Sequence, residues 1–152
     1  MNESKAGGFP VAHIKDLLRA DEDVNVGSDA VNSCLDHLEN LKEKFNQKLT
    51  SRMKSIKRKT IRGSDVDTTL TSIGIDTDKE FPNPRLTKAA SKRFFEAKNL
   101  ELWVSGGALF LLKNSLEAYI REIGDISRIY IAELNRKTIN SQAVLKAIES
   151  IS

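Results

Sequence analysis

Two long stretches of the chain place hydrophobic residues at the three- and four-residue spacing of an amphipathic helix. The first stretch contains Val31, Cys34, Leu35, Leu38, Leu41, Phe45, Leu49, Met53 and Ile56, with no proline between them. This pattern predicts one helix of about 28 residues, or roughly 42 Å at 1.5 Å per residue. The second stretch contains Leu109, Leu112, Leu116, Tyr119, Ile123, Ile126, Tyr130 and Leu134. A helix of this length in a small protein needs a partner lying along it.

Short amphipathic segments precede and follow each long helix. We expect four short helices, over residues 9–20, 63–73, 87–98 and 141–151. In the third of these we expect Ala89, Ala90, Phe94 and Ala97 to face inward. Brief extended segments are predicted before each long helix and at Ile61. Gly124 within the second long helix costs about 1 kcal/mol relative to alanine, which predicts a close contact at that position.

One four-residue motif occurs twice. Arg58-Lys59-Thr60-Ile61 returns as Arg136-Lys137-Thr138-Ile139, each time behind a long helix and ahead of a short one. Order, spacing and flanking periodicity agree, so the chain is an internal duplication. We expect a flexible arm at residues 1–8, a first copy at 9–73, a connector at 74–84 and a second copy at 85–152.

Each copy resembles a histone fold, in which a short helix, a long helix and a short helix are joined by extended loops. The first copy is similar to archaeal histones through Phe9-Pro10-Val11, Val26, Ala30, Arg58-Lys59-Thr60-Ile61 and Asp65-Val66. The second copy resembles them more loosely, through Val104-Ser105, Ala108 and Arg136-Lys137-Thr138-Ile139. The tandem is similar to the histone doublets of some archaea and large viruses.

The resemblance implies an all-α fold of two tandem histone folds, paired within one chain in the handshake that the family forms between separate chains. Physical reasoning supports this pairing, because one copy has too little else to cover the apolar stripe of its long helix. Two copies that cross their long helices head to tail bury both stripes. Each Arg-Lys-Thr loop would then lie beside the loop before the other copy's long helix, which gives two equivalent basic ends.

The resemblance also implies binding to the phosphate backbone of double-stranded DNA, with little sequence specificity and with bending or compaction of the duplex. Lys59 and Lys137 match the phosphate-contacting lysines of the family, and Thr60 and Thr138 match the adjacent hydroxyl donors. The residues expected at DNA are Lys15, Arg19, Lys57, Arg58, Lys59, Thr60, Arg62, Lys88, Lys92, Arg136, Lys137 and Thr138, with Arg93 as a further candidate.

Some positions depart from the family pattern. Arg58 matches an arginine that pairs with an acid in the last helix, and Asp65 stands at the position of that acid, but Ala143 takes its place in the second copy. Asn25 and Trp103 stand where the family has an arginine that enters the minor groove. Trp103 either stacks on a base or packs in the seam between the copies, and its alternating apolar surroundings favour the seam.

Charge is distributed unequally between the copies. The net charge is +3, yet residues 1–78 carry 12 basic and 13 acidic side chains, whereas residues 79–152 carry 12 and 8. The basic residues from Lys44 to Ser64 are interrupted by no acid, which makes this run a candidate phosphate-binding surface. The negative charges of Asp21, Glu22 and Asp23 would repel phosphates along the expected path of DNA. We therefore expect weaker DNA binding than a typical archaeal histone shows.

Several classes of protein do not fit the sequence. The most apolar run is far shorter than the roughly 20 residues that span a bilayer, and the first eight residues lack the apolar core of a secretory signal. Cys34 is the single cysteine, so no internal disulfide forms, and its place in the apolar stripe predicts packing. His13 and His37 belong to no Cys/His cluster, so we expect no metal site. We find no catalytic motif, and expect no enzymatic activity, no cofactor and no small-molecule substrate.

Two functions remain as hypotheses. The first is an architectural DNA-binding protein located inside the cell, on the chromosome or nucleoid. The second is a histone-fold scaffold that assembles proteins and binds DNA weakly or not at all. In either case, association between copies of the chain, or with other histone-fold proteins, is a further expectation.

Overall fold

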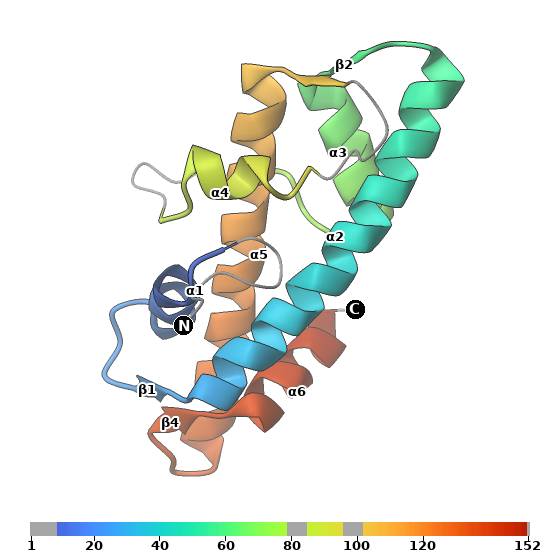
Figure 1. The fold of residues 1–152 in the computed structure, drawn as a ribbon. Helices are drawn as coiled ribbons and strands as arrows, with labels where there is room; N and C mark the ends of the chain where they lie inside the picture. The colour runs from blue at the N-terminus through green and yellow to red at the C-terminus, as the bar shows by residue number, and fades with distance from the viewer. Residues whose placement is uncertain (1–8, 79–84, 96–101, 152) are drawn as a thin grey trace.

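The computed structural model describes residues 9–78, 85–95 and 102–151, which form helices joined by loops with two-residue strands (Figure 1). In chain order the elements are α1 (Val11–Arg19), β1 (Asn25–Val26), α2 (Ser28–Ile56), β2 (Thr60–Ile61), α3 (Gly63–Ser72), α4 (Lys88–Lys92), β3 (Trp103–Val104), α5 (Gly106–Glu133), β4 (Thr138–Ile139) and α6 (Ser141–Ile151). The fold is all-α, as the sequence predicts.

The two long helices, α2 and α5, cross each other and form the centre of the molecule (Figure 1). The short helices α3 and α6 each pack against both of them. One continuous hydrophobic core therefore contains residues of both copies, among them the fully buried Leu38, Phe45, Leu112, Leu116 and Ile123. This shared burial is what the two apolar stripes need, since neither copy could cover its own stripe.

Two short parallel ladders connect the copies. β1 pairs with β4, with Asn25 opposite Thr138, and β2 pairs with β3, with Thr60 opposite Trp103. Each Arg-Lys-Thr loop thus lies beside the loop before the other copy's long helix, as the duplication predicts. The side chain of Asp29 strengthens the first junction, because it accepts hydrogen bonds from the backbone N–H groups of Ala30 and Ser141, at 2.9 Å each.

The first helix of the second copy is shorter than predicted. α4 ends at Lys92, and the N–H of Phe94 bonds back to the carbonyl of Ser91, in a tight turn. The helical path stops because the amide of Asn46 donates to the Phe94 carbonyl at 2.8 Å and the Phe94 ring packs on Phe45. Ala90 and Phe94 are buried as predicted, but Ala89 is exposed. Ala97 lies outside the described residues.

Two other details differ from the sequence-based expectation. α3 ends at Ser72, one residue earlier than predicted, and Arg62 is its N-cap, where Asp65 accepts a hydrogen bond from the Arg62 backbone N–H at 2.8 Å. Leu134 does not belong to the buried stripe, because α5 ends at Glu133 and the chain turns outward. Cys34 is buried as predicted, and burial raises the pKa of its thiol to about 12.

The start of the connector packs against the core through Ile75. Gly74 has a φ of +87°, a conformation that glycine adopts without strain, and the Ile75 that follows it is buried. The proposed arm at residues 1–8 and the part of the connector at residues 79–84 lie outside the described residues, so the domain boundaries remain predictions.

Candidate nucleic-acid interface

The first Arg-Lys-Thr loop and the loop before α5 form one end of the molecule, which we call the β2–β3 end and define as residues 57–62 and 102–105. Lys57 ends α2 in a left-handed conformation with a φ of 54°, which turns the chain out of the helix. The backbone N–H of Trp103 then donates to the Lys59 carbonyl at 2.8 Å. Lys57, Lys59 and Arg62 are exposed here, and Thr60 is half-buried.

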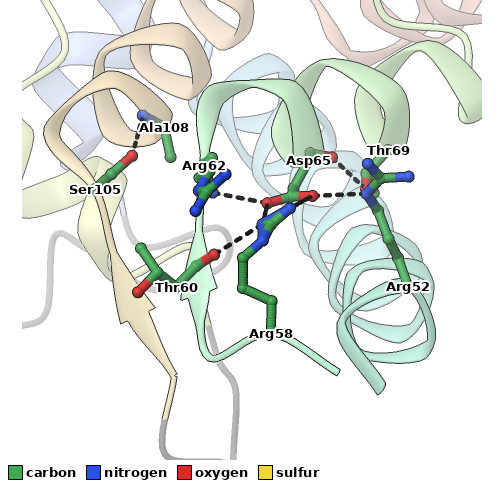
Figure 2. A network of polar contacts seen from close by, with 8 residues as sticks. All are labelled: Arg52, Arg58, Thr60, Arg62, Asp65, Thr69, Ser105 and Ala108. Atoms are coloured by element: carbon green, nitrogen blue, oxygen red, sulfur yellow. Dashed lines mark hydrogen bonds and ion pairs between the residues drawn. The ribbon is translucent and has the colours of Figure 1, made fainter. Parts of the chain in front are cut away.

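A buried carboxylate holds this loop against the two helices that flank it. Asp65 of α3 is fully buried and accepts hydrogen bonds from Arg58 Nη1 at 2.6 Å, Arg58 Nη2 at 2.9 Å and Arg52 Nε at 2.7 Å (Figure 2). Arg58 also donates to the Thr60 carbonyl at 3.0 Å. Arg58 and Asp65 therefore form the predicted pair, and Arg52 of α2 completes it.

The charge state of Asp65 follows from these contacts. Burial by itself raises the pKa of the carboxyl, but the hydrogen bonds from the Arg62 N–H and Arg52, together with the positive charges of Arg58 and Arg52, outweigh burial and hold the pKa below its usual value. Asp65 is thus ionised, and both of its carboxylate oxygens accept hydrogen bonds from groups inside the protein. It presents no free negative charge to a ligand at the surface.

A cavity of about 300 Å³ lies under the same end. Its lining combines an apolar part, Met53 and Leu102, with the four cationic residues Lys54, Lys57, Arg58 and Lys59. A lining that combines cationic and apolar side chains suits an anionic group that has a non-polar side.

The other end, which we call the β1–β4 end and define as residues 20–27 and 135–140, carries a different charge. Arg136, Lys137 and Thr138 are exposed, but Asp21, Glu22 and Asp23 are exposed beside them. Lys137 Nζ lies 3.8 Å from Asp23 Oδ2. The expectation of two equivalent basic ends was therefore wrong, because the ladder that places Lys137 at this end also brings the acidic turn after α1 against it.

Arg136 differs from its counterpart Arg58. Ala143 is buried at the position that matches Asp65, and the structure shows no side-chain hydrogen bond or ion pair for Arg136 among the described residues. Its guanidinium is exposed and available to a ligand.

The first helices of the copies carry the remaining predicted cations. α1 and α4 lie on the same side of α5, between the two ends (Figure 1). Lys88 and Lys92 of α4 are exposed, whereas Lys15 and Arg19 of α1 are half-buried. Arg93 is exposed as well. Nearby, Arg85 lies 3.5 Å from Asp16 and 3.8 Å from Asp21, so part of the positive charge on this side is compensated.

Comparison with known proteins finds a similar structure but no similar sequence family. No family model matches the chain, and no curated protein does either. Among solved structures, the histone from Methanopyrus kandleri superposes with a TM-score of 0.74 at 20% sequence identity, covering 91% of this chain and 92% of that one. The chain has the histone fold.

Trp103 does not fill the seam between the two halves of this histone fold, as the sequence suggested. Its side chain is 74% exposed. The alternation that suggested packing is real, but Leu102 and Val104 face inward, and Trp103, between them, points outward.

Two residues that support the β2–β3 end, Arg52 and Lys54, were not predicted from the sequence. Arg52 lies 13 residues before Asp65 and reaches it only because α3 folds back along α2. Lys54 lies one turn before Lys57 and lines the cavity. Both belong to the basic run that begins at Lys44, which was the available signal.

Among the described residues, no group of His, Cys, Asp and Glu is arranged to hold a metal ion. The same residues include no helix with the length and hydrophobicity that a transmembrane span requires.

Proposed function

We propose that this chain is a histone-like architectural protein of the chromosome, which binds double-stranded DNA through its phosphates with little sequence specificity and bends or compacts it. The β2–β3 end is the observation that supports this function best. It exposes Lys57, Lys59 and Arg62 beside the Thr60 hydroxyl, and the described residues 57–62 and 102–105 include no carboxylate. The Asp65 carboxylate is buried and accepts hydrogen bonds from two arginines.

The arrangement suits a phosphate backbone. Lysine and arginine side chains neutralise phosphates, and a loop held by a β-ladder presents them in one fixed geometry. The exposed Lys88 and Lys92 on α4, and Lys15 and Arg19 on α1, lie between the ends, where a bent duplex would pass. Arg136, Lys137 and Thr138 form the second, weaker contact, because the acidic turn opposes them.

The test is fluorescence anisotropy of a labelled, random-sequence duplex of about 60 base pairs, titrated with the protein at several salt concentrations. We expect binding that weakens steeply with salt, and a Lys59→Glu/Lys137→Glu variant whose log–log salt slope is smaller by about 2. The matched control is Lys113→Glu/Lys146→Glu, which makes the same change in net charge outside both ends and outside the basic run of residues 44–64. The proposal fails if the wild type does not bind at low salt, or if both variants weaken binding equally.

A second candidate function is assembly through the histone fold, and one observation favours it. Exposed large hydrophobic side chains are concentrated in the second copy, where Ile129 is 61%, Leu145 55% and Leu134 45% exposed. The partner we propose is a second copy of this chain, because α6 and the end of α5 carry both Glu133 and Lys146, and a two-fold axis can place opposite charges together.

Sedimentation velocity over a range of concentrations tests this second candidate. We expect the wild type to form dimers of the chain, and an Ile129→Asp/Leu145→Asp variant to remain monomeric with unchanged helix content. A wild type that is monomeric at every concentration would remove self-association.

A further inference from the structure

Trp103 is a large apolar side chain without a packing role. It is the single tryptophan of the chain and is 74% exposed, whereas Phe9, Phe45 and Phe94 are fully buried. Leaving an indole in water forgoes the stabilisation that burial of an aromatic side chain provides. Packing of the folded chain therefore does not explain why a tryptophan stands at this position.

The backbone of Trp103 is held firmly. Its N–H donates to the Lys59 carbonyl at 2.8 Å, and two residues later the Ser105 N–H donates to the Ile61 carbonyl at 3.0 Å. The Ser105 side chain accepts a hydrogen bond from the Ala108 N–H at 3.1 Å, which caps α5 directly after the strand (Figure 2). The indole thus extends from a ladder and a capped helix start, and can present its face to a ligand with little loss of backbone entropy.

The surroundings of the indole are cationic. Trp103 is opposite Thr60 in the ladder, and because side chains alternate along a strand, Thr60, Arg62 and Trp103 share the outer face while Ile61 is buried. Lys57 and Lys59 are exposed in the same loop. A polyanion that contacts these cations would come against the indole, whereas an apolar protein surface would have to cover their positive charge.

The opposite end of the molecule lacks this combination. Asn25 occupies the place of Trp103 in the β1–β4 ladder, opposite Thr138. It stands beside the acidic turn at residues 21–23. Only the β2–β3 end joins an exposed aromatic face to uncompensated cations within the described residues.

We propose that Trp103 stacks on an unpaired or unstacked nucleobase of DNA held at the β2–β3 end, which gives the protein a preference for duplexes with a locally opened step. The inference rests on the proposed DNA binding. Stacking on an aromatic side chain tolerates any base, so the preference concerns the structure of DNA and not its sequence. A base in a continuous duplex is stacked on both faces, whereas a bulged base can leave the helix at small cost.

The experiment compares a continuous duplex with the same duplex carrying one unpaired nucleotide at its centre. Anisotropy of labelled DNA measures binding, while the intrinsic emission of Trp103 and its quenching by acrylamide report on the indole alone, since no other tryptophan contributes. We expect the bulged duplex to bind about tenfold more tightly, to quench the emission of Trp103 and to protect it from acrylamide.

Variants separate stacking from general affinity. Trp103→Ala should bind both duplexes equally, and Trp103→Phe should keep part of the preference. Phe110→Ala, which removes another exposed aromatic side chain outside the β2–β3 end, should leave the preference unchanged. Binding by anisotropy without any change in emission or acrylamide access would overturn the inference and leave the proposed function intact. The inference would also be overturned if Trp103→Ala reduced the affinity for both duplexes by the same factor. A wild type that binds neither duplex would remove the proposed function and this inference together.

Discussion

Gly124 of α5 lies directly against the backbone of Leu18 in α1. A Cβ atom added at position 124 would lie 2.7 Å from the Leu18 carbonyl oxygen and 2.9 Å from its Cα. Arg128, one turn later, donates to the same carbonyl at 2.6 Å. The sequence predicts a close contact at this glycine, and the structure identifies the partner as the end of the first copy's first helix.

Gly124→Ala should therefore destabilise the protein, although alanine is the better helix former. We expect a loss of about 1–3 kcal/mol in the free energy of unfolding, because the two atoms nearest to the added Cβ belong to the Leu18 backbone, which cannot move aside. Urea denaturation measures it. Gly106→Ala in the first turn of the same helix is the control, since nothing lies within 4 Å of a Cβ there, and it should cost nothing. Equal stability of the two variants would show that α1 and α5 are not packed this closely.

Asp65→Asn should destabilise the protein by about 3–5 kcal/mol, because it leaves Arg58 and Arg52 without their buried counter-charge. Asp67→Asn on the exposed side of α3 is the matched control and should have a much smaller effect.

The same carboxylate predicts a pH dependence. Because the folded-state pKa of Asp65 lies below that of an unfolded aspartate, about 3.9, its stabilisation is present above about pH 4 and is lost as the pH falls through the folded-state pKa. The free energy of unfolding of the wild type should fall over this range, and that of Asp65→Asn should fall less. Parallel pH profiles for the two proteins would contradict this role of the carboxylate.

Glu117→Gln should loosen the segment before α4. The fully buried Glu117 of α5 accepts hydrogen bonds from the backbone N–H groups of Arg85 at 2.8 Å and Leu86 at 3.0 Å, and from the Arg121 side chain at 2.8 Å. A glutamine amide would direct its NH₂ at one of these donors, so we expect a loss of about 1–3 kcal/mol in denaturant unfolding. Glu122→Gln, at an exposed position of the same helix, should leave the midpoint unchanged.

Asp21→Asn/Asp23→Asn should strengthen DNA binding, because it removes the charges that oppose Arg136 and Lys137 at the β1–β4 end. We expect a gain of about three- to tenfold at low salt that shrinks as salt is added. Anisotropy with the continuous duplex measures it. Asp36→Asn/Asp76→Asn makes the same change in net charge at exposed positions outside both ends. An equal gain from both variants would assign the effect to net charge alone.

The helices could be predicted because they depend on local pattern. The periodic apolar residues of α2 and α5, the capping Ser105 and the repeated Arg-Lys-Thr-Ile motif are all visible along the chain, and they specify two long amphipathic helices that need each other. The pair between Arg58 and Asp65 followed from a resemblance, and the geometry agrees with it.

The character of the two ends depends on contacts between residues far apart in sequence. Lys59 and Lys137 occupy the same place in the repeat, yet the fold brings Asp23 to Lys137 and no described carboxylate to the exposed face around Lys59. Alternation placed Trp103 within an apolar run, but only the packing of β3 on the molecule decided that its two neighbours turn inward and the indole outward. The sequence by itself determined that the fold is all-α and where its two long helices lie. The tertiary structure decided which charges remain uncompensated and which aromatic side chain stays in water, because exposure is set by the elements that cover a residue and not by its own pattern.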